Sequence, residues 1–383
     1  MIDDPLENMA VDMSGPTVTK FRPPQAEPED VAPHDSLIDP ASRIKTKNED
    51  QILLDASMIE RILAARLVSQ LGFSEEAACV TVKHLIAAEQ AGRDCHGLIR
   101  LKPLFDGAFD FSSRRRPVPD VISSSLVTFD GSGVPGYYVV ATMLETAIEL
   151  AEKSGVCFAV GRNIYPSGYL GLYGRIAAEA GFLAHIEATS PSRVTAPGGA
   201  KPYLGTNPIC RAYPLENQMP VVIDLATSAI THGDLLLAQA TGAELPQHTA
   251  VRKDRSPARF VQDFDPSKGE GALLPFGGAH AYKAFALAMG VALQTSYGGS
   301  PPAAAGGGAF GLSILLIDIG RLGRTHDAER AAWVSSLSEN ESVRIPGWNS
   351  IACARAWEAR GLVPVARETW HMIRPYLSLG ETR

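Results

Sequence analysis

Apolar residues recur every three or four positions after about residue 55, and this spacing predicts two consecutive helices. The first covers 55–72 and ends at Gly72. Ser74 is placed to cap the second helix, which continues to about Ala91. A third helical pattern covers 97–109. We therefore expect a helical region in this part of the chain.

Shorter apolar runs follow, separated by turns rich in glycine and proline. They predict strands and two helices, namely strands over 126–130, 156–160, 182–190, 219–226 and 312–319, and helices over 138–153 and 284–293. Four stretches read as loops, namely 196–199, 205–208, 250–270 and 298–309. From about residue 327 the chain is again mostly helical, with an interruption at 344–348.

The first 48 residues show almost no periodicity and are predicted to be a disordered tail. Residues 1–50 contain eleven acidic and five basic side chains, so they account for −6 of the net charge of −7. The remainder is close to neutral. It therefore has neither the basic surface expected of a nucleic-acid-binding protein nor a polybasic membrane patch.

Five cysteines are scattered without CxxC spacing, which argues against a disulfide framework and against a zinc site. The chain opens on acidic residues rather than on a signal-peptide pattern, and its apolar runs are too short to span a bilayer. We expect a cytoplasmic protein that holds no metal.

The segment Asp94-Cys95-His96-Gly97-Leu98-Ile99-Arg100 joins the second and third predicted helices. His96 and Arg100 stand four residues apart, so in a helix they would share one face. A histidine moves protons near neutral pH, and an arginine binds a carboxylate through two hydrogen bonds. The pair suits a small carboxylate-bearing substrate, although spacing alone also fits a solvated surface cluster.

Gly131, Gly133 and Gly136 match the dinucleotide fingerprint G-x-G-x-x-G between a predicted strand and a predicted helix. Pro135 weakens the match because it removes a backbone donor from the turn. The second strand also ends without an acidic residue for a ribose, although Arg162 would suit a 2′-phosphate. A nucleotide site and a plain turn both remain open here.

Polar side chains also stand at the ends of further predicted strands and helices. The buried strand before Asp224 places this residue and Thr227 where a ligand would meet them. Asp234 stands at the start of the next predicted helix, where a capping role is equally open. Farther on, a glycine-rich loop opens a helix beside Lys283, a combination that suits a phosphate.

Several motifs together resemble the family of NAD(P)-dependent malate/L-lactate and imine dehydrogenases of the non-Rossmann type. In chain order, the matching segments are Asp94–Arg100, Gly205-Thr206-Asn207-Pro208-Ile209, Asp224-Leu225-Ala226-Thr227-Ser228-Ala229, Leu274-Pro275-Phe276-Gly277-Gly278 and Ile345-Pro346-Gly347. The run from Asp224 to Asp234, which ends in His-Gly-Asp, is most similar to the Δ1-piperideine-2-carboxylate/Δ1-pyrroline-2-carboxylate (cyclic imino acid) reductases.

This resemblance implies an α+β fold, with a non-Rossmann NAD(P)-binding domain on a mostly antiparallel sheet and a helical domain from both chain ends. The implied division is 1–48 tail, 49–115 with 325–383 helical domain, and 116–324 cofactor-binding domain. It also implies a homodimer, and it leaves the turn 131–136 without a nucleotide-binding role.

The resemblance also implies roles for individual residues. His96 would donate the proton, Cys95 and Asp234 would complete its relay, and Arg100 with Thr206 would bind the substrate. NADPH, or NADH, would lie along Ser167, Gly168, Asp224, Leu225, Ala226, Thr227, Tyr282, Lys283, Pro346, Gly347 and Trp348.

The chain departs from the family pattern near this site. Cys95 replaces a serine and is a weaker hydrogen-bonding group. Pro166 stands where the family usually has a histidine, and Ala284 and Ala286 replace glycines beside Lys283. These departures indicate a changed substrate or, alternatively, a lost activity.

The leading hypothesis is NADPH-dependent reduction of the C=N bond of a cyclic α-imino acid. A 2-oxo acid reductase of malate or lactate type is the alternative among enzymes. A cofactor-binding protein without redox turnover is the alternative from another class.

Overall fold

The computed structural model describes residues 51–107, 111, 113–302, 310–323, 326–340 and 342–377. The predicted tail 1–48 and most of the predicted loop 298–309 lie outside these residues. Within the described ranges, no helix is both long enough and apolar enough to cross a lipid bilayer.

Two capped helices open the described chain. α2 (Ala56–Leu71) is capped by the Asp55 side chain and ends at Gly72, which adopts the left-handed conformation. Ser74 caps α3 (Glu75–Gln90) through the same kind of side-chain hydrogen bond. Both helices bury their apolar positions, so these two predictions are confirmed.

The third predicted helix, over 97–109, is mostly wrong. The chain forms two single 3₁₀ turns, η2 (Asp94–His96) and η3 (Leu98–Arg100), and then the short α4 (Leu101–Phe105). Gly97 separates the two turns with ψ of −143°, which no helix contains.

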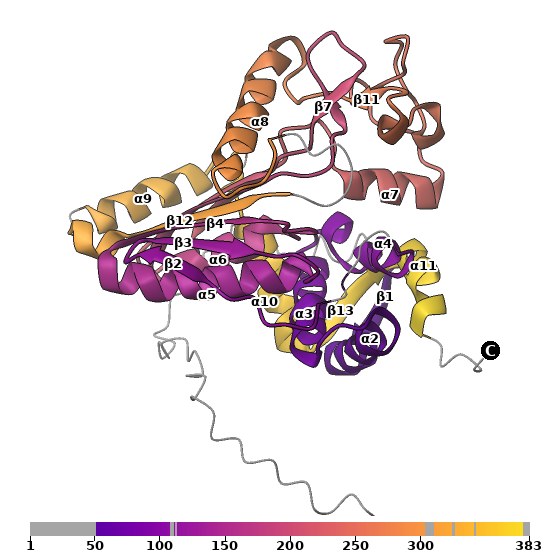
Figure 1. Cartoon of the computed structure of the whole chain (residues 1–383). Coiled ribbons are helices and arrows are strands. Elements are labelled where there is room, and N and C mark those ends of the chain that lie inside the picture. Colours follow the sequence, from indigo (N-terminus) through magenta and orange to yellow (C-terminus); the bar gives the residue numbers. More distant parts are fainter. Residues whose placement is uncertain are drawn as a thin grey trace, which may run out of the picture. The chain divides into compact units, whose positions relative to one another are not determined.

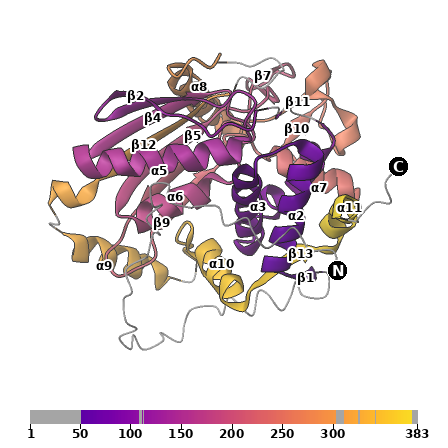
Figure 2. The ribbon, with the colours of Figure 1, turned by 60° about the horizontal axis from the view of Figure 1, so that its bottom comes forward.

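The two ends of the described chain pair directly, which the sequence did not predict. β1 (Gln51–Asp55) and β13 (Leu362–Ala366) form an antiparallel two-stranded sheet. α10 (Trp348–Arg360) packs on α3, and α11 (Arg367–Leu377) packs on α2 (Figure 2). The expected helical region from both ends of the chain is therefore present.

A seven-stranded sheet forms the centre, in the order β2-β3-β4-β12-β5-β8-β9. Among its described neighbours, β3 and β4 run parallel and the other pairs are antiparallel, as expected. Its strands are β2 (Asp120–Ser123), β3 (Leu126–Asp130), β4 (Val156–Arg162), β5 (Phe182–Ala188), β8 (Ile209–Tyr213), β9 (Val221–Leu225) and β12 (Leu312–Asp318). β8 was not predicted.

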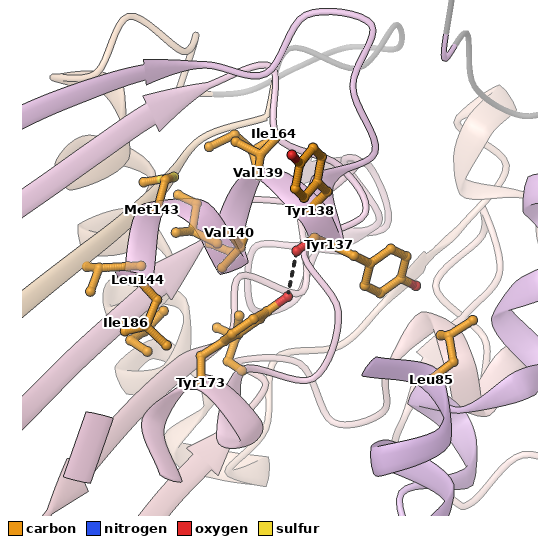
Figure 3. Packing of buried hydrophobic residues seen from close by; sticks show 14 of the residues in the cluster. Leu85, Tyr137, Tyr138, Val139, Val140, Met143, Leu144, Ile164, Tyr173 and Ile186 are labelled. Carbon is orange, nitrogen blue, oxygen red and sulfur yellow. Dashed lines mark hydrogen bonds between the residues drawn. The ribbon is translucent and has the colours of Figure 1, made fainter. Parts of the chain in front are cut away.

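Helices cover both faces of this sheet. α5 (Gly136–Ser154) and α6 (Leu170–Glu179) pack on one face, and α8 (Ala281–Ser296) lies over the other (Figure 1). Figure 3 shows the core around α5, where the Tyr173 hydroxyl donates to the Tyr137 carbonyl at 3.3 Å. A buried tyrosine needs such a partner, so this bond fixes α6 against α5.

A smaller four-stranded sheet, in the order β10-β11-β6-β7, has its own core with α7 (His232–Thr241). Its strands and neighbouring turns are β6 (Val194–Thr195), β7 (Pro202–Leu204), β10 (Ala250–Val251), β11 (Ala272–Leu273), η4 (Val261–Asp263), η5 (Pro266–Lys268) and η6 (Gly278–His280). β7 lies between the predicted loops 196–199 and 205–208 and was not predicted, because a strand of three residues in a proline-rich segment leaves no alternating pattern. η7 (Ile319–Leu322) and α9 (Asp327–Ser338) follow β12.

The glycine-rich turn between β3 and α5 is filled by protein. The Gly131 N–H donates to the Arg162 carbonyl and the Gly136 N–H donates to the Tyr165 carbonyl. A Cβ on Gly131 would lie 2.6 Å from the Asn163 carbonyl oxygen, so this glycine is needed for close packing. The turn therefore has a structural reason for its glycines, and the Rossmann interpretation does not apply.

Candidate functional site

A cavity of about 260 Å³ is formed by η2, η3, the ends of β4, β5 and β9, and the start of α7. It brings together most of the residues expected at the site, namely Cys95, His96, Arg100, Ser167, Gly168, Thr206, Asp224, Leu225, Ala226 and Asp234. This is the size of site that suits a small ligand.

His96 and Arg100 both line the cavity, but they do not share a helix face. The chain bends at Gly97, against which the buried Glu89 side chain packs so closely that a Cβ would overlap it. Glu89 Oε1 also accepts the Leu98 N–H at 2.7 Å. The expected common helical face is therefore wrong, and Glu89 positions the two turns instead.

His96 is joined to a short polar chain. Its Nδ1 lies 3.0 Å from Cys95 Sγ. Burial raises the pKa of Cys95 to about 12, Asp234 adds to the rise, and Arg100 and a hydrogen bond with Thr231 partly offset it. The thiol is therefore protonated at neutral pH, and which of Sγ and Nδ1 donates in this contact depends on the histidine tautomer.

The proton affinity of His96 depends on what occupies the cavity. Burial lowers the pKa of His96 to about 3, and Arg100, the buried His84 and Arg93 add to the effect. The Tyr169 ring lies beside the imidazole, with centroids 6.2 Å apart. An anion bound at Arg100 raises the pKa again, because it cancels the nearest positive charge.

Asp234 caps α7 and also lines the cavity. Its Oδ2 accepts the N–H and the hydroxyl of Thr231, each at 2.7 Å, and Thr231 Oγ1 accepts the Asp234 N–H at 3.2 Å. Gly233 packs against the Cys95 carbonyl, where a Cβ would overlap. The capping role is thus present, and the expected relay role has a continuous polar path from Asp234 through Thr231 and Cys95 to His96.

Asp224 ends β9 and faces the N-terminus of α6. Its Oδ2 accepts the Gly171 N–H at 2.7 Å. Burial raises the pKa of Asp224 to about 6, while the Gly171 bond and Arg93 oppose the rise. The carboxyl therefore changes charge closer to neutral pH than an ordinary aspartate does.

A second hollow, of about 200 Å³, shares Arg93 with the cavity and includes the turn Pro346-Gly347. The turn lies on β9, since the Val222 N–H donates to the Pro346 carbonyl and Gly347 has φ of +88°. Arg93 Nε is buried without a hydrogen-bond partner among the described residues, and Arg344 lines the same hollow. Two cations and a glycine turn fit an anionic nucleotide, so the residues present fit the expected cofactor.

Thr227 supports the cavity from outside it. Its N–H and its hydroxyl both donate to the Thr206 carbonyl, at 2.9 and 3.0 Å. The Thr206 N–H donates in turn to Ser190 Oγ at 2.9 Å. The buried Thr227 therefore holds Thr206 and Ser190 in the cavity wall, while its expected contact with a cofactor remains a prediction.

His84 is a packed histidine, as the sequence favoured. Its Nε2 accepts the Tyr169 N–H at 2.7 Å, and burial lowers its pKa to about 3. Gly168 lies against the His84 ring so closely that a Cβ would overlap it. The histidine thus positions the segment that carries Gly168 and Tyr169 into the cavity.

Four residues expected to bind the cofactor lie outside both hollows, and Thr227 is one of them. Tyr282 and Lys283 are exposed at the start of α8, and Trp348 begins α10 with its Nε1 donating to the Met219 carbonyl at 3.1 Å. Their cofactor roles remain predictions. The described residues contain no group of three or more His, Cys, Asp or Glu side chains placed to hold a metal ion.

The structure also shows where the residues that depart from the family pattern lie. The Pro166 carbonyl packs against Gly136, and no histidine enters the cavity from this segment. His232, at the start of α7, lines the cavity instead. Ala284 is buried and Ala286 is exposed on α8.

Sequence reasoning missed several cavity residues, namely Arg93, Tyr165, Tyr169, Ser190, Pro191, Arg193, Pro208, Thr231, His232 and Gly233. Arg93 and Thr231 adjoin quoted motifs, so closer attention to motif edges would have found them. Arg193 has no such signal, because its neighbours in sequence are unremarkable loop residues.

The sequence model of the family described as malate/L-lactate dehydrogenase matches residues 57–374. The chain belongs to this family. Similar proteins include an L-lactate dehydrogenase of Cupriavidus necator, 34% identical over 229 residues, which are 57% of this chain and 64% of that protein. A Δ1-pyrroline-2-carboxylate/Δ1-piperideine-2-carboxylate reductase of Pseudomonas putida is 32% identical over 228 residues, 58% of this chain and 64% of that protein.

Solved structures of this family share the fold. A Δ1-piperideine-2-carboxylate reductase from Pseudomonas syringae superposes with a TM-score of 0.74 and 25% identity, over 85% of this chain and 99% of that chain. A malate dehydrogenase from Pyrococcus horikoshii gives 0.71 and 23%, over 86% and 95%. In the sequence alignments, the matched part spans 58% to 64% of the length of the malate dehydrogenase from Pyrococcus abyssi, the lactate dehydrogenase and the imino acid reductase.

Proposed function

We propose that this protein is an NAD(P)H-dependent oxidoreductase that reduces the C=N bond of a cyclic α-imino acid. The observation that carries the proposal is the pairing of His96 and Arg100 in one cavity, with His96 backed by Cys95. This arrangement offers a carboxylate anchor and a proton donor side by side, as reduction of a C=N bond next to a carboxylate requires.

The cofactor is proposed to extend from the cavity into the hollow at Pro346-Gly347. Arg93 and Asp224 stand at the junction, and Arg344 adds a cation for a phosphate. When bound there, a reduced nicotinamide supplies the hydride to the imine carbon. We favour NADPH over NADH because both arginines suit an additional phosphate, and parallel assays with each nucleotide test this choice.

The protein's own part in the reaction is anchoring and proton transfer. Arg100 binds the substrate carboxylate, with Thr206 on the adjacent wall. The bound anion raises the pKa of His96, so the imidazole takes a second proton. As the π electrons of the C=N bond move to nitrogen, His96 Nε2 gives that nitrogen a proton, and Cys95 and Thr231 connect the ring to Asp234.

Loss of NADPH absorbance with a panel of cyclic imino acids and 2-oxo acids tests the proposal. We expect oxidation with an imine. Oxidation with a 2-oxo acid of equal carbon number, but not with the imine, would replace this function by the malate or lactate type, which relatives named malate and L-lactate dehydrogenase favour.

The third possibility is a protein that binds nucleotide without turnover. The proline at position 166 favours it, since this segment places no histidine in the cavity. Nucleotide binding without oxidation by any compound of the panel would support this possibility, and robust turnover would remove it.

The proposal also covers the cellular location, the oligomeric state and the domain division of the protein. All five cysteines lie in the described residues, and no disulfide bond joins any two of them, which supports a cytoplasmic location. We propose a homodimer, with the exposed apolar side of α8, formed by Met289, Leu293 and the adjoining Tyr297, as its contact surface. We also propose the two-domain division given above, 49–115 with 325–383 and 116–324.

A further inference from the structure

Arg193 is a cation in the cavity wall that no motif explains. Its backbone is fixed between two strands, since its N–H donates to the Leu204 carbonyl and its carbonyl accepts the Leu273 N–H. Its guanidinium makes no hydrogen bond and no ion pair within the described part of the chain. An arginine held in a cavity wall without an anionic partner is costly unless a ligand supplies one.

The carboxylate that acts on Arg193 at longer range, that of Asp265, already has other bonding partners. The negative charge of Asp265 favours the charged form of the Arg193 guanidinium. However, the Asp265 carboxylate accepts the Ser267 hydroxyl at 2.5 Å and lies 3.0 Å from Lys268 Nζ. The positive charge of Arg193 therefore remains available to a ligand in the cavity.

His232 adds a second group at the same end of the cavity. Its Nδ1 is buried and has no hydrogen-bond partner among the described residues. Burial lowers the pKa of His232 to about 2, with Arg193 and Arg100 adding to the effect, so the ring is neutral. A neutral imidazole beside an arginine can complete a binding site for an anionic group.

Arg193 and Arg93 mark different ends of the cavity. Arg93 also lines the hollow with Pro346-Gly347, to which the cofactor is assigned. Arg193 and His232 instead also line a hollow of about 590 Å³ formed by α7, η4 and η5. The substrate end thus contains two arginines, Arg100 and Arg193.

The charges at this end match a doubly negative ligand. Arg100 and Arg193 contribute two positive charges, and each can pair with one anionic group. Arg93 and Asp224 offset each other at the other end. A ligand with one negative charge would leave one of the two arginines without an anionic partner, whereas a dianion pairs with both.

We infer that the substrate carries two anionic groups, one bound by Arg100 beside the reducible bond and a second bound by Arg193 with His232. The inference rests on the proposed reductase function and narrows its substrate to α-imino or α-oxo acids with a second carboxylate or similar anion. Arg193 is then a specificity residue rather than a catalytic one.

Matched substrates test the inference. The cyclic pair is Δ1-piperideine-2-carboxylate and the same ring with a second carboxylate at carbon 6. The open-chain pair is 2-oxopentanoate and 2-oxoglutarate. We expect kcat/KM to favour the dianion of the productive pair by about 30-fold or more, as for loss of one partner of a desolvated charge pair.

Variants separate the second subsite from general damage. Arg193→Met should abolish the preference by lowering kcat/KM for the dianion, and Arg193→Lys should keep part of the preference. Arg211→Met, at an exposed position on β8, is the matched control and should change neither value. Equal rates with both members of a pair, or an unchanged preference in Arg193→Met, would overturn the inference.

Binding of unreactive acids provides a readout without turnover. Glutarate should bind the wild type at least about tenfold more tightly than pentanoate, and Arg193→Met should remove the difference. If no compound is reduced but glutarate shows this pattern, the proposed function fails and the second anion subsite stands. If glutarate and pentanoate bind equally well, the subsite is refuted whatever the activity.

Discussion

Gly233 packs so closely against the carbonyl of Cys95 that any side chain on Gly233 would overlap it. This contact joins the first turn of α7 to η2, which lie far apart in sequence. Since Cys95 contacts His96 and Gly233 precedes Asp234, the glycine sets the spacing of the whole proton relay.

Gly233→Ala should therefore weaken both folding and turnover. Forcing the backbones apart costs about 1–3 kcal/mol of stability, and a shift of about 1 Å in His96 lowers kcat roughly 100-fold. Thermal unfolding and steady-state assays measure the two effects. Gly290→Ala on α8 is the control, because a Cβ there meets nothing within 4 Å and should be harmless. Normal kcat in Gly233→Ala would contradict the role given to this contact.

Much of the fold could be predicted from local sequence patterns, because these patterns determine where helices begin and end. Asp55, Gly72 and Ser74 bound α2 and α3 as their capping chemistry predicts. By contrast, β1 and β13 pair across most of the chain, and neither carries an alternating pattern long enough to read. Pairing between distant segments leaves no local signal.

The candidate site could likewise be predicted only in part from the sequence. His96, Asp224 and His232 lie within recognisable motifs, whereas Arg193 lies in none and reaches the cavity only because the folded chain brings it there. Gly97 prevented the expected helix, since the buried Glu89 packs on it. Sequence spacing therefore selected two residues, His96 and Arg100, that line one cavity, but it described their relative geometry wrongly.

Cys95 should be a functional substitute for serine rather than a reactive thiol. With a pKa of about 12 it stays protonated, so alkylation by iodoacetamide at neutral pH should be slow. Cys95→Ser should keep or raise kcat because a hydroxyl is the stronger donor, and Cys95→Ala should lower it by about tenfold or more. Equal kcat in the serine and alanine variants would exclude Cys95 from the relay.

Asp224 should make stability fall as pH rises. Its pKa is about 6 in the folded protein against 3.8 ordinarily, so the folded state binds the extra proton between these values. This group's contribution to stability is greatest below about pH 4, decreases up to about pH 6 and is then constant, a loss of about 3 kcal/mol.

Asp224→Asn should remove that loss. Urea unfolding at about pH 4.5 and about pH 7.5 should show a smaller decrease in the free energy of unfolding for the variant than for the wild type. Asp120→Asn, at an exposed position on β2, should behave like the wild type. The same decrease in all three proteins would show that Asp224 is not the group responsible.

The exposed side of α8 should govern assembly. Met289 and Leu293 are 49% and 51% exposed and stand four residues apart, so they form one apolar stripe. Changing both to Asp should convert a dimer into a monomer, as measured by light scattering after gel filtration. Val121→Asp, at a similarly exposed apolar position on β2, should leave the dimer intact. A dimer that survives the α8 changes would place the interface elsewhere.

A comparison of the wild type with His96→Asn decides whether His96 donates the proton. Steady-state reduction should be measured for the wild type and His96→Asn, with the dissociation constant for NADPH determined on the same preparations. We expect kcat/KM to fall by about 10²- to 10⁴-fold while NADPH binding changes by less than about threefold. Turnover within tenfold of the wild type, with nucleotide bound equally well, would contradict the claim and assign the proton to another group.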